Sequence, residues 1–145
     1  MKAIFLTLII FYVFHVGSLG QTVPKRANVI NIELADSSSI TSVTRLLVEY
    51  GYGIQHLDRQ AGVITTTPKS VKRAGEVRLI ISIGSGKAII RGSYKGVAVT
   101  LNNVTDDSWS EIDYRGMEGS PTMSAWNEMM RIAKAIGPNI TFAQK

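Results

Sequence analysis

The amino-acid sequence predicts an α+β domain, with an antiparallel sheet of about 4–6 strands and two amphipathic helices packed on one face. Two segments, 40–50 and 121–136, repeat apolar residues every three or four positions, which is the pattern of a helix with one buried side. The segment 76–94 instead alternates its side chains around a glycine-rich turn, which is typical of two hairpin strands. Because short turns join the expected strands, neighbouring strands must run antiparallel.

Local patterns predict the first strand and the first helix. Segment 28–34 is rich in Ile, Val and Leu, which favours a strand. Side-chain oxygens in 36–39 can cap a helix start, and Gly51 can adopt the left-handed conformation that ends a helix. Between these signals, one apolar stripe contains Ile40, Val43, Leu46, Leu47 and Tyr50.

Two hairpins are expected after this helix. Segments 52–58 and 63–67 form the first, and the alternating segment 76–94 forms the second around Gly84-Ser85-Gly86. Residues 68–75 are expected to be a basic connector between them. Three other parts stay open: 97–103 can extend the sheet, 111–115 can be a short edge strand, and 139–144 is either a last strand or a loose tail.

The last helix has the clearest boundaries in the sequence. Ser120 can cap it, Pro121 suits its first turn, and Gly137-Pro138 ends it. Its apolar stripe contains Met123, Trp126, Met130 and Ala133, flanked by Met129 and Ile136, while Asn127, Glu128, Arg131 and Lys134 are expected to face solvent. A Trp and Met stripe of this kind is typical of a helix that packs on a core.

The N-terminus predicts export. Lys2 precedes an apolar stretch, and Ser18 and Gly20 satisfy the small-residue rule for cleavage, so residues 1–20 are expected to be a signal peptide and 21–145 a single α+β domain. The alternative is an uncleaved anchor, but a helix over 3–16 would be about 21 Å long at about 1.5 Å per residue, short of a bilayer of about 30 Å. The chain has no cysteine, which suits an oxidising compartment and rules out a lipid anchor on an N-terminal cysteine.

Net charge narrows the expected partners. After loss of Lys2, 15 basic and 11 acidic residues remain, a net charge of +4. A basic chain in the cytosol would suggest nucleic acid, but export favours other partners, either anionic envelope material or an envelope or secreted protein with an acidic surface, and no nucleic acid is expected. No membrane span is expected after signal cleavage, and the oligomeric state is open.

Basic residues on the second hairpin are the candidate binding residues. If the helices cover the side of Val77 and Leu79, the opposite side carries Arg78, Lys87 and Arg91. The basic connector adds three candidates at the rim of that open face, namely Lys69, Lys72 and Arg73.

Residue counts exclude several chemistries. His56 is the one histidine left after cleavage, so a histidine-based triad and a three-histidine zinc site are excluded. The segment 84–87 resembles a phosphate-binding loop, but Ala88 stands where that loop needs Ser or Thr. Acidic side chains gather between Asp106 and Asp113, without the alternating spacing of a calcium loop. No cofactor, metal or catalytic residue is therefore expected.

The segment 51–67, with its Gly-Tyr, its Asp-Arg, its glycine turn and its Thr-rich strand, is familiar. Together with the helix before it, about residues 38–67, it resembles the repeated helix-on-sheet domain of the outer-membrane assembly lipoprotein C and related small bacterial envelope proteins. The resemblance implies a non-enzymatic accessory domain that binds other proteins. This chain differs from that family in two ways: it has no lipobox cysteine, and it contains one such domain instead of several.

Three functions are compatible with these patterns. The first is an exported, non-enzymatic binding module of the bacterial cell envelope, which contacts a protein partner through the open sheet face or a sheet edge. The alternative is a small secreted enzyme inhibitor of helix-grip type. A hydrolase that uses the acidic segment 106–113 is the third.

Overall fold

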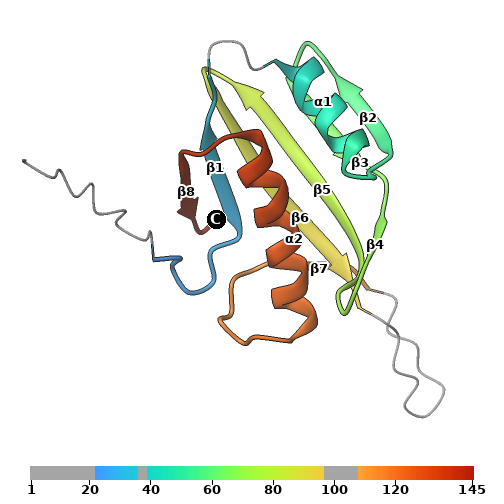
Figure 1. Cartoon of the computed structure of the whole chain (residues 1–145), viewed down its shortest axis with the longest axis vertical. Helices are drawn as coiled ribbons and strands as arrows, with labels where there is room; N and C mark the ends of the chain where they lie inside the picture. The colour runs from blue at the N-terminus through green and yellow to red at the C-terminus, as the bar shows by residue number, and fades with distance from the viewer. Residues whose placement is uncertain (1–21, 36–38, 97–107) are drawn as a thin grey trace, which may run out of the picture.

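The computed structural model describes residues 22–35, 39–96 and 108–145 (Figure 1). These residues confirm the α+β class and form an eight-stranded antiparallel sheet with two helices. The elements, in chain order, are β1 Val29–Glu33, α1 Ile40–Glu49, β2 Ile54–Asp58, β3 Val63–Thr66, β4 Lys69–Val71, β5 Gly75–Gly84, β6 Lys87–Lys95, β7 Ser110–Glu111, α2 Pro121–Ile136 and β8 Ile140–Ala143.

The sheet is built around the long hairpin of β5 and β6. Its main order is β2-β3-β5-β6-β1-β8, with β4 beside β3 on β5 and β7 beside β1 on β6. The turn between β5 and β6 contains Ser85 and Gly86, both with positive φ, as a two-residue hairpin turn requires. The interpretation of this segment as a hairpin turn is thus confirmed.

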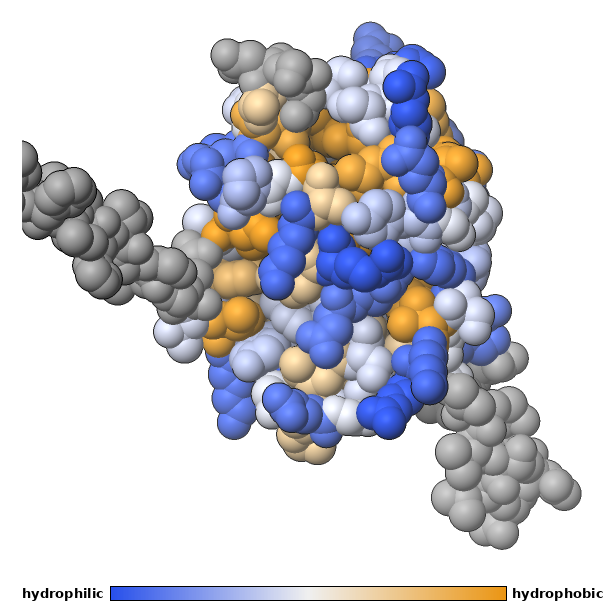
Figure 2. Space-filling view, in the orientation of Figure 1, coloured by the Kyte–Doolittle hydropathy of each residue, from blue (hydrophilic) through white to orange (hydrophobic). Residues whose placement is uncertain are grey.

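Both helices lie on the same side of the sheet (Figure 1). Underneath them, Val77, Leu79 and Ile81 of β5 are fully buried, together with Ala88 and Ile90 of β6. The alternation therefore has the phase that the sequence analysis assumed, with Arg78 on the uncovered side. Seen from the helix side, hydrophilic side chains cross the middle of the surface and hydrophobic surface shows at intervals (Figure 2).

Side-chain caps explain where the helices begin. The Ser39 and Ser42 side chains each accept a hydrogen bond from the other's backbone N–H, which forms a capping box at α1. Ser120 caps α2 by accepting from the N–H of Met123. Trp126 is at the centre of the buried side of α2, as the stripe predicts, although Met129 is buried more deeply than Met130.

The structure corrects the sequence analysis in the short elements. Residues 68–75 are not a mere connector, because β4 pairs with the start of β5 and forms a hairpin with it. The edge strand expected at 111–115 is replaced by β7, which covers only Glu111 of that segment together with Ser110, whereas the tail forms the strand β8. These additions raise the strand number above the predicted range. The strand expected at 97–103 lies outside the described residues.

The predicted signal peptide also lies outside the part of the chain that the structure describes, as do Asp106 and Asp107 of the acidic segment. Within the described ranges, neither helix is long and apolar enough to cross a membrane.

Candidate functional site

The uncovered face of the sheet is the candidate functional site, and we call it the open face. Its centre is a pair of adjacent rows across the long hairpin: Arg78 lies opposite Ser93, and Ile80 lies opposite Arg91. Ile80 keeps 45% of its surface exposed, although an isoleucine in the middle of a sheet is normally buried. The open face thus combines an exposed apolar side chain with two guanidinium groups.

Arg78 is held in place by two contacts. Its Nε donates a 2.8 Å hydrogen bond to the Ser93 hydroxyl, and its guanidinium carbon lies 4.4 Å from the centre of the Trp109 ring. Trp109 comes just before β7, which pairs with β6 and so carries the ring to this face. Because stacking on Trp and the bond to Ser93 orient the planar guanidinium, its remaining donors are presented in a fixed direction.

Arg91 and Lys87 differ from Arg78 in their surroundings. Arg91 is exposed and makes no hydrogen bond or ion pair with another of the described residues. Lys87 is exposed too, but it lies directly across from Glu33 of β1, so a carboxylate is close to its charge. Glu111 of β7 lies opposite Ser93, so the row of Arg78 also carries a carboxylate, although no ion pair joins Glu111 to Arg78 or Arg91. Arg78 and Arg91 are the two cations at the centre of the open face.

The three basic residues of the expected connector, Lys69, Lys72 and Arg73, do not lie together in the structure. Lys72 and Arg73 are exposed in the turn between β4 and β5, with Arg73 in the left-handed region at φ 68°. They lie at the end of the sheet, at the tip of a hairpin. Lys69 is opposite Val77 in the sheet, so its side chain points to the helix side. The expectation that Lys69 lies at the rim of the open face is wrong.

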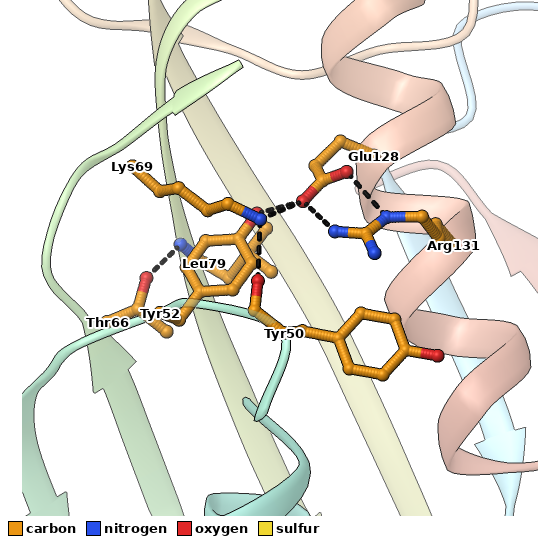
Figure 3. Close-up of polar contacts among 7 residues, drawn as sticks. All are labelled: Tyr50, Tyr52, Thr66, Lys69, Leu79, Glu128 and Arg131. Atoms are coloured by element: carbon orange, nitrogen blue, oxygen red, sulfur yellow. Dashed lines mark hydrogen bonds and ion pairs between the residues drawn. The ribbon is translucent and has the colours of Figure 1, made fainter. Parts of the chain in front are cut away.

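Lys69 instead belongs to a polar cluster between β4 and α2, which we call the Glu128 cluster (Figure 3). Oε1 of Glu128 accepts hydrogen bonds from Lys69 Nζ at 3.0 Å, from the Tyr52 hydroxyl at 3.1 Å and from Arg131 Nη2 at 2.7 Å. Arg131 Nε donates to the second carboxylate oxygen at 2.8 Å. The expectation that Glu128 faces solvent is therefore wrong, and its side chain is only 10% exposed.

Two aromatic rings and one carbonyl complete the Glu128 cluster. Lys69 Nζ lies 4.7 Å from the centre of the Tyr52 ring and donates to the Tyr50 carbonyl at 2.6 Å. The Arg131 guanidinium lies 4.6 Å from the centre of the Tyr50 ring. Since Tyr50 follows α1 directly, the cluster joins the end of that helix to β4 and to α2 (Figure 3).

Burial and neighbouring charges shift two ionisation equilibria in the Glu128 cluster. Burial acts to raise the pKa of Glu128, but the hydrogen bonds and positive charges of Arg131 and Lys69 outweigh it and leave this pKa below its usual 4.5. Burial, together with the Glu128 carboxylate, raises the pKa of Tyr52 well above 10. The carboxylate therefore stays ionised and the phenol stays neutral near pH 7, which suits a structural ion pair.

The described residues form no group of three or more His, Cys, Asp or Glu that could hold a metal ion. His56 is exposed on β2. Of the acidic segment, Asp113 pairs with Arg115 through a 2.9 Å contact, while Asp106 and Asp107 lie outside the described residues. A polar depression of about 350 Å³ lies beside this pair, and a smaller one of about 240 Å³ lies next to Glu33 and Lys87.

The sequence patterns did not reveal two features of the open face. They did not connect Trp109 with Arg78, because only the pairing of β7 with β6 brings the ring there. They also did not identify the exposed Ile80 as part of a binding surface. The signal was present in the alternation, since Ile80 occupies the polar phase of its strand.

No protein-family model matches this chain, and no curated protein matches it significantly. The resemblance to the repeated domain of the assembly lipoprotein therefore stays a prediction.

Proposed function

We propose that this chain is an exported, non-enzymatic binding module of the bacterial cell envelope, and that the open face docks a protein partner with an acidic surface. The observation that supports this most directly is the pair of rows Arg78–Ser93 and Ile80–Arg91. It places an exposed aliphatic side chain between two arginines on a face that neither helix covers.

The residue types on the open face are those that dominate protein interfaces. Arg and Trp are enriched among the residues that contribute most to binding, and an apolar centre with a polar rim is the usual layout. Here Ile80 supplies the apolar centre, while Arg78, stacked on Trp109, supplies an oriented cation. An arginine fork of fixed direction suits recognition of a carboxylate with two parallel hydrogen bonds.

Charge supports an acidic partner. Arg91 makes no ion pair with another described residue, although Glu111 lies on the same face opposite Ser93, so its guanidinium can pair with a partner carboxylate. Charges at a surface of this kind mainly raise the rate of encounter and are screened over about 8 Å at physiological salt. We therefore expect capture of the partner to weaken as salt is raised.

Export is part of the proposal and has its own test. The expected mature chain starts at Gln21, after the small residues Ser18 and Gly20. N-terminal sequencing or intact mass of the protein from its host would show that start. Recovery of the full-length chain in the membrane fraction would contradict export by cleavage.

The binding experiment compares two double variants of the tagged mature protein in capture from an envelope fraction. Arg78→Ser with Arg91→Ser removes the charge of the open face. Arg45→Ser with Lys134→Ser is the matched control, since it removes two exposed charges from the helices on the other side of the sheet. Circular dichroism verifies that both fold.

We expect the open-face variant to lose a specific captured protein that the control variant retains, and raised salt to reproduce the loss. A partner captured equally by the two variants at low salt would contradict docking on the open face. Loss of the same partner by the control variant alone would place the contact on the helices.

A further inference from the structure

The two edges of the sheet are protected to different degrees. β2, at one edge, has an irregular register between Ile54 and His56 and bears the charged Asp58. β8, at the other edge, consists of Ile-Thr-Phe-Ala, pairs with β1 in unbroken register and has no charged side chain. Bulges and charges are two of the devices that keep edge strands from pairing with other chains; a third, short strand length, is shared by both edges. β8 has neither a bulge nor a charge, and only its short length limits pairing.

The hydrogen-bond pattern shows which backbone groups of β8 point outward. Glu33 N–H donates to the Asn139 carbonyl, so Asn139 is in the phase that bonds to β1, and Thr141 and Ala143 share that phase. Leu34 N–H donates to Gly86 on the opposite side of β1, which agrees with this alternation. The N–H and C=O groups of Ile140 and Phe142 therefore point away from β1. Within the described residues, no other strand pairs with them.

We infer that β8 pairs antiparallel with β8 of a second copy of this chain, around a two-fold axis at Thr141. Residues that pair across two strands must lie on the same face of the sheet. Ile140 and Phe142 meet this condition, because they are two positions apart in β8 and share its helix side. With Thr141 opposite itself, Ile140 of each copy lies opposite Phe142 of the other. This register uses every outward N–H and C=O of Ile140 and Phe142, and it stays within the bounds of β8.

A second copy fits this edge better than a charged partner does. In a two-fold contact each residue near the axis meets its own counterpart, so a charged strand would repel itself. β8 brings only apolar and hydroxyl side chains to the axis. Ile140 and Phe142 are half-buried against the core, and Phe142 lies 6.0 Å from Trp126 between ring centres, so the pairing would extend the existing core. This contact is independent of the open face proposed above.

The contact is small, and this determines how it must be tested. A four-residue strand pair buries much less than the about 1,200 Å² of a standard stable interface, so the dimer should be weak and should form only as concentration rises. Because the sequence contains no cysteine, a single introduced cysteine can report the weak dimer by disulfide crosslinking. At the axis, Thr141 belongs to a non-hydrogen-bonded pair, whose Cα atoms are about 4.5 Å apart, close enough for a disulfide.

The experiment introduces one cysteine at a time into the purified protein. Thr141→Cys is expected to form a disulfide-linked dimer under mild oxidation at least about tenfold faster than His56→Cys, an exposed control on the opposite edge strand, because paired strands raise the effective concentration of the thiols. Sedimentation of the unmodified protein should show a concentration-dependent dimer. Thr141→Lys should abolish it, and His56→Lys should not.

Several outcomes would overturn the inference. One is equal crosslinking of the two cysteine variants together with a monomer at the highest concentration. Another is a dimer that survives Thr141→Lys, since it must use another surface. Because Thr141 is exposed, its replacement should leave the far-ultraviolet circular dichroism unchanged, and this measurement verifies that each variant is folded.

Discussion

The same strands form both faces of the sheet, but the polar side chains of the two faces differ in whether they have hydrogen-bond partners. On the covered side, the Thr66 hydroxyl accepts the N–H of Leu79 at 2.9 Å, and Glu128 receives donors from three residues. No buried side-chain polar atom of the described residues lacks a hydrogen-bond partner. On the open face, Arg91 has no such partner among these residues and Ile80 is exposed. The comparison indicates that the covered face stabilises the fold, whereas the open face is available to a partner.

The largest expected effect is on the covered face. Trp126→Ala should lower the free energy of unfolding by about 3–5 kcal/mol, the usual range for removal of a buried large aromatic side chain. The ring is 2% exposed and lies between Tyr114, at 5.6 Å, and Phe142. Denaturant unfolding measures the change. A loss below about 1 kcal/mol would show that this side of α2 is not core, and the contrast between the faces would disappear.

Glu128→Gln tests the polar part of the covered face. We expect a loss of about 1–3 kcal/mol, because charged hydrogen bonds from Lys69 and Arg131 weaken and the half-buried Lys69 loses its counter-charge. The matched control is Asp113→Asn, which removes the acid of the pair with the exposed Arg115, a pair with one cation instead of two, and should hardly move the unfolding midpoint. Equal effects of the two variants would mean that the Glu128 cluster behaves like an ordinary surface ion pair.

The pH dependence of stability should show the same cluster. The pKa of Glu128 is lower in the folded chain than its usual 4.5, so its ionised form stabilises the fold above that pH. This contribution is lost as the pH falls through the lowered pKa, because protonation removes the charge that Lys69 and Arg131 contact. The difference in melting temperature between the unmodified chain and Glu128→Gln should therefore be largest near pH 7 and shrink under acid. A difference that is constant from pH 7 to strongly acidic solution would contradict this assignment.

The contrast between the two faces also explains which features were predictable. The phase of β5 follows from a period of two within one strand, so Val77 and Arg78 were assigned to opposite sides correctly. Glu128 was not, because it lies off the apolar stripe of α2, and only the approach of β4 and Tyr52 along that flank buries it. Lys69 was misplaced for a related reason, since a strand of three residues is too short for its alternation to be recognised.

The partner of Arg78 was unpredictable from local pattern as well. Trp109 is far from Arg78 in the sequence, and their contact depends on which strand β7 joins. Local patterns thus predicted the fold class, both helices and the polarity of the open face. The pairing of short strands, which depends on tertiary contacts, determined the Glu128 cluster and the contact of Trp109 with Arg78 on the open face.

The smallest expected effect is on the open face. Arg91→Ser should change the free energy of unfolding by no more than about 0.5 kcal/mol, because exposed positions without specific contacts tolerate substitution. Arg78→Ser is the informative comparison, since it also removes the contacts with Ser93 and Trp109, and its loss should be larger than that of Arg91→Ser. Denaturant unfolding of both variants shows which of the two loses more stability.

If Arg91→Ser instead destabilised the chain by more than about 1 kcal/mol, some part of the chain would have to cover this face, and the surface assigned to a partner would already be occupied. If both variants were neutral while capture of the acidic partner was lost, the contacts of Arg78 would serve to orient its guanidinium and would add little to the stability of the sheet.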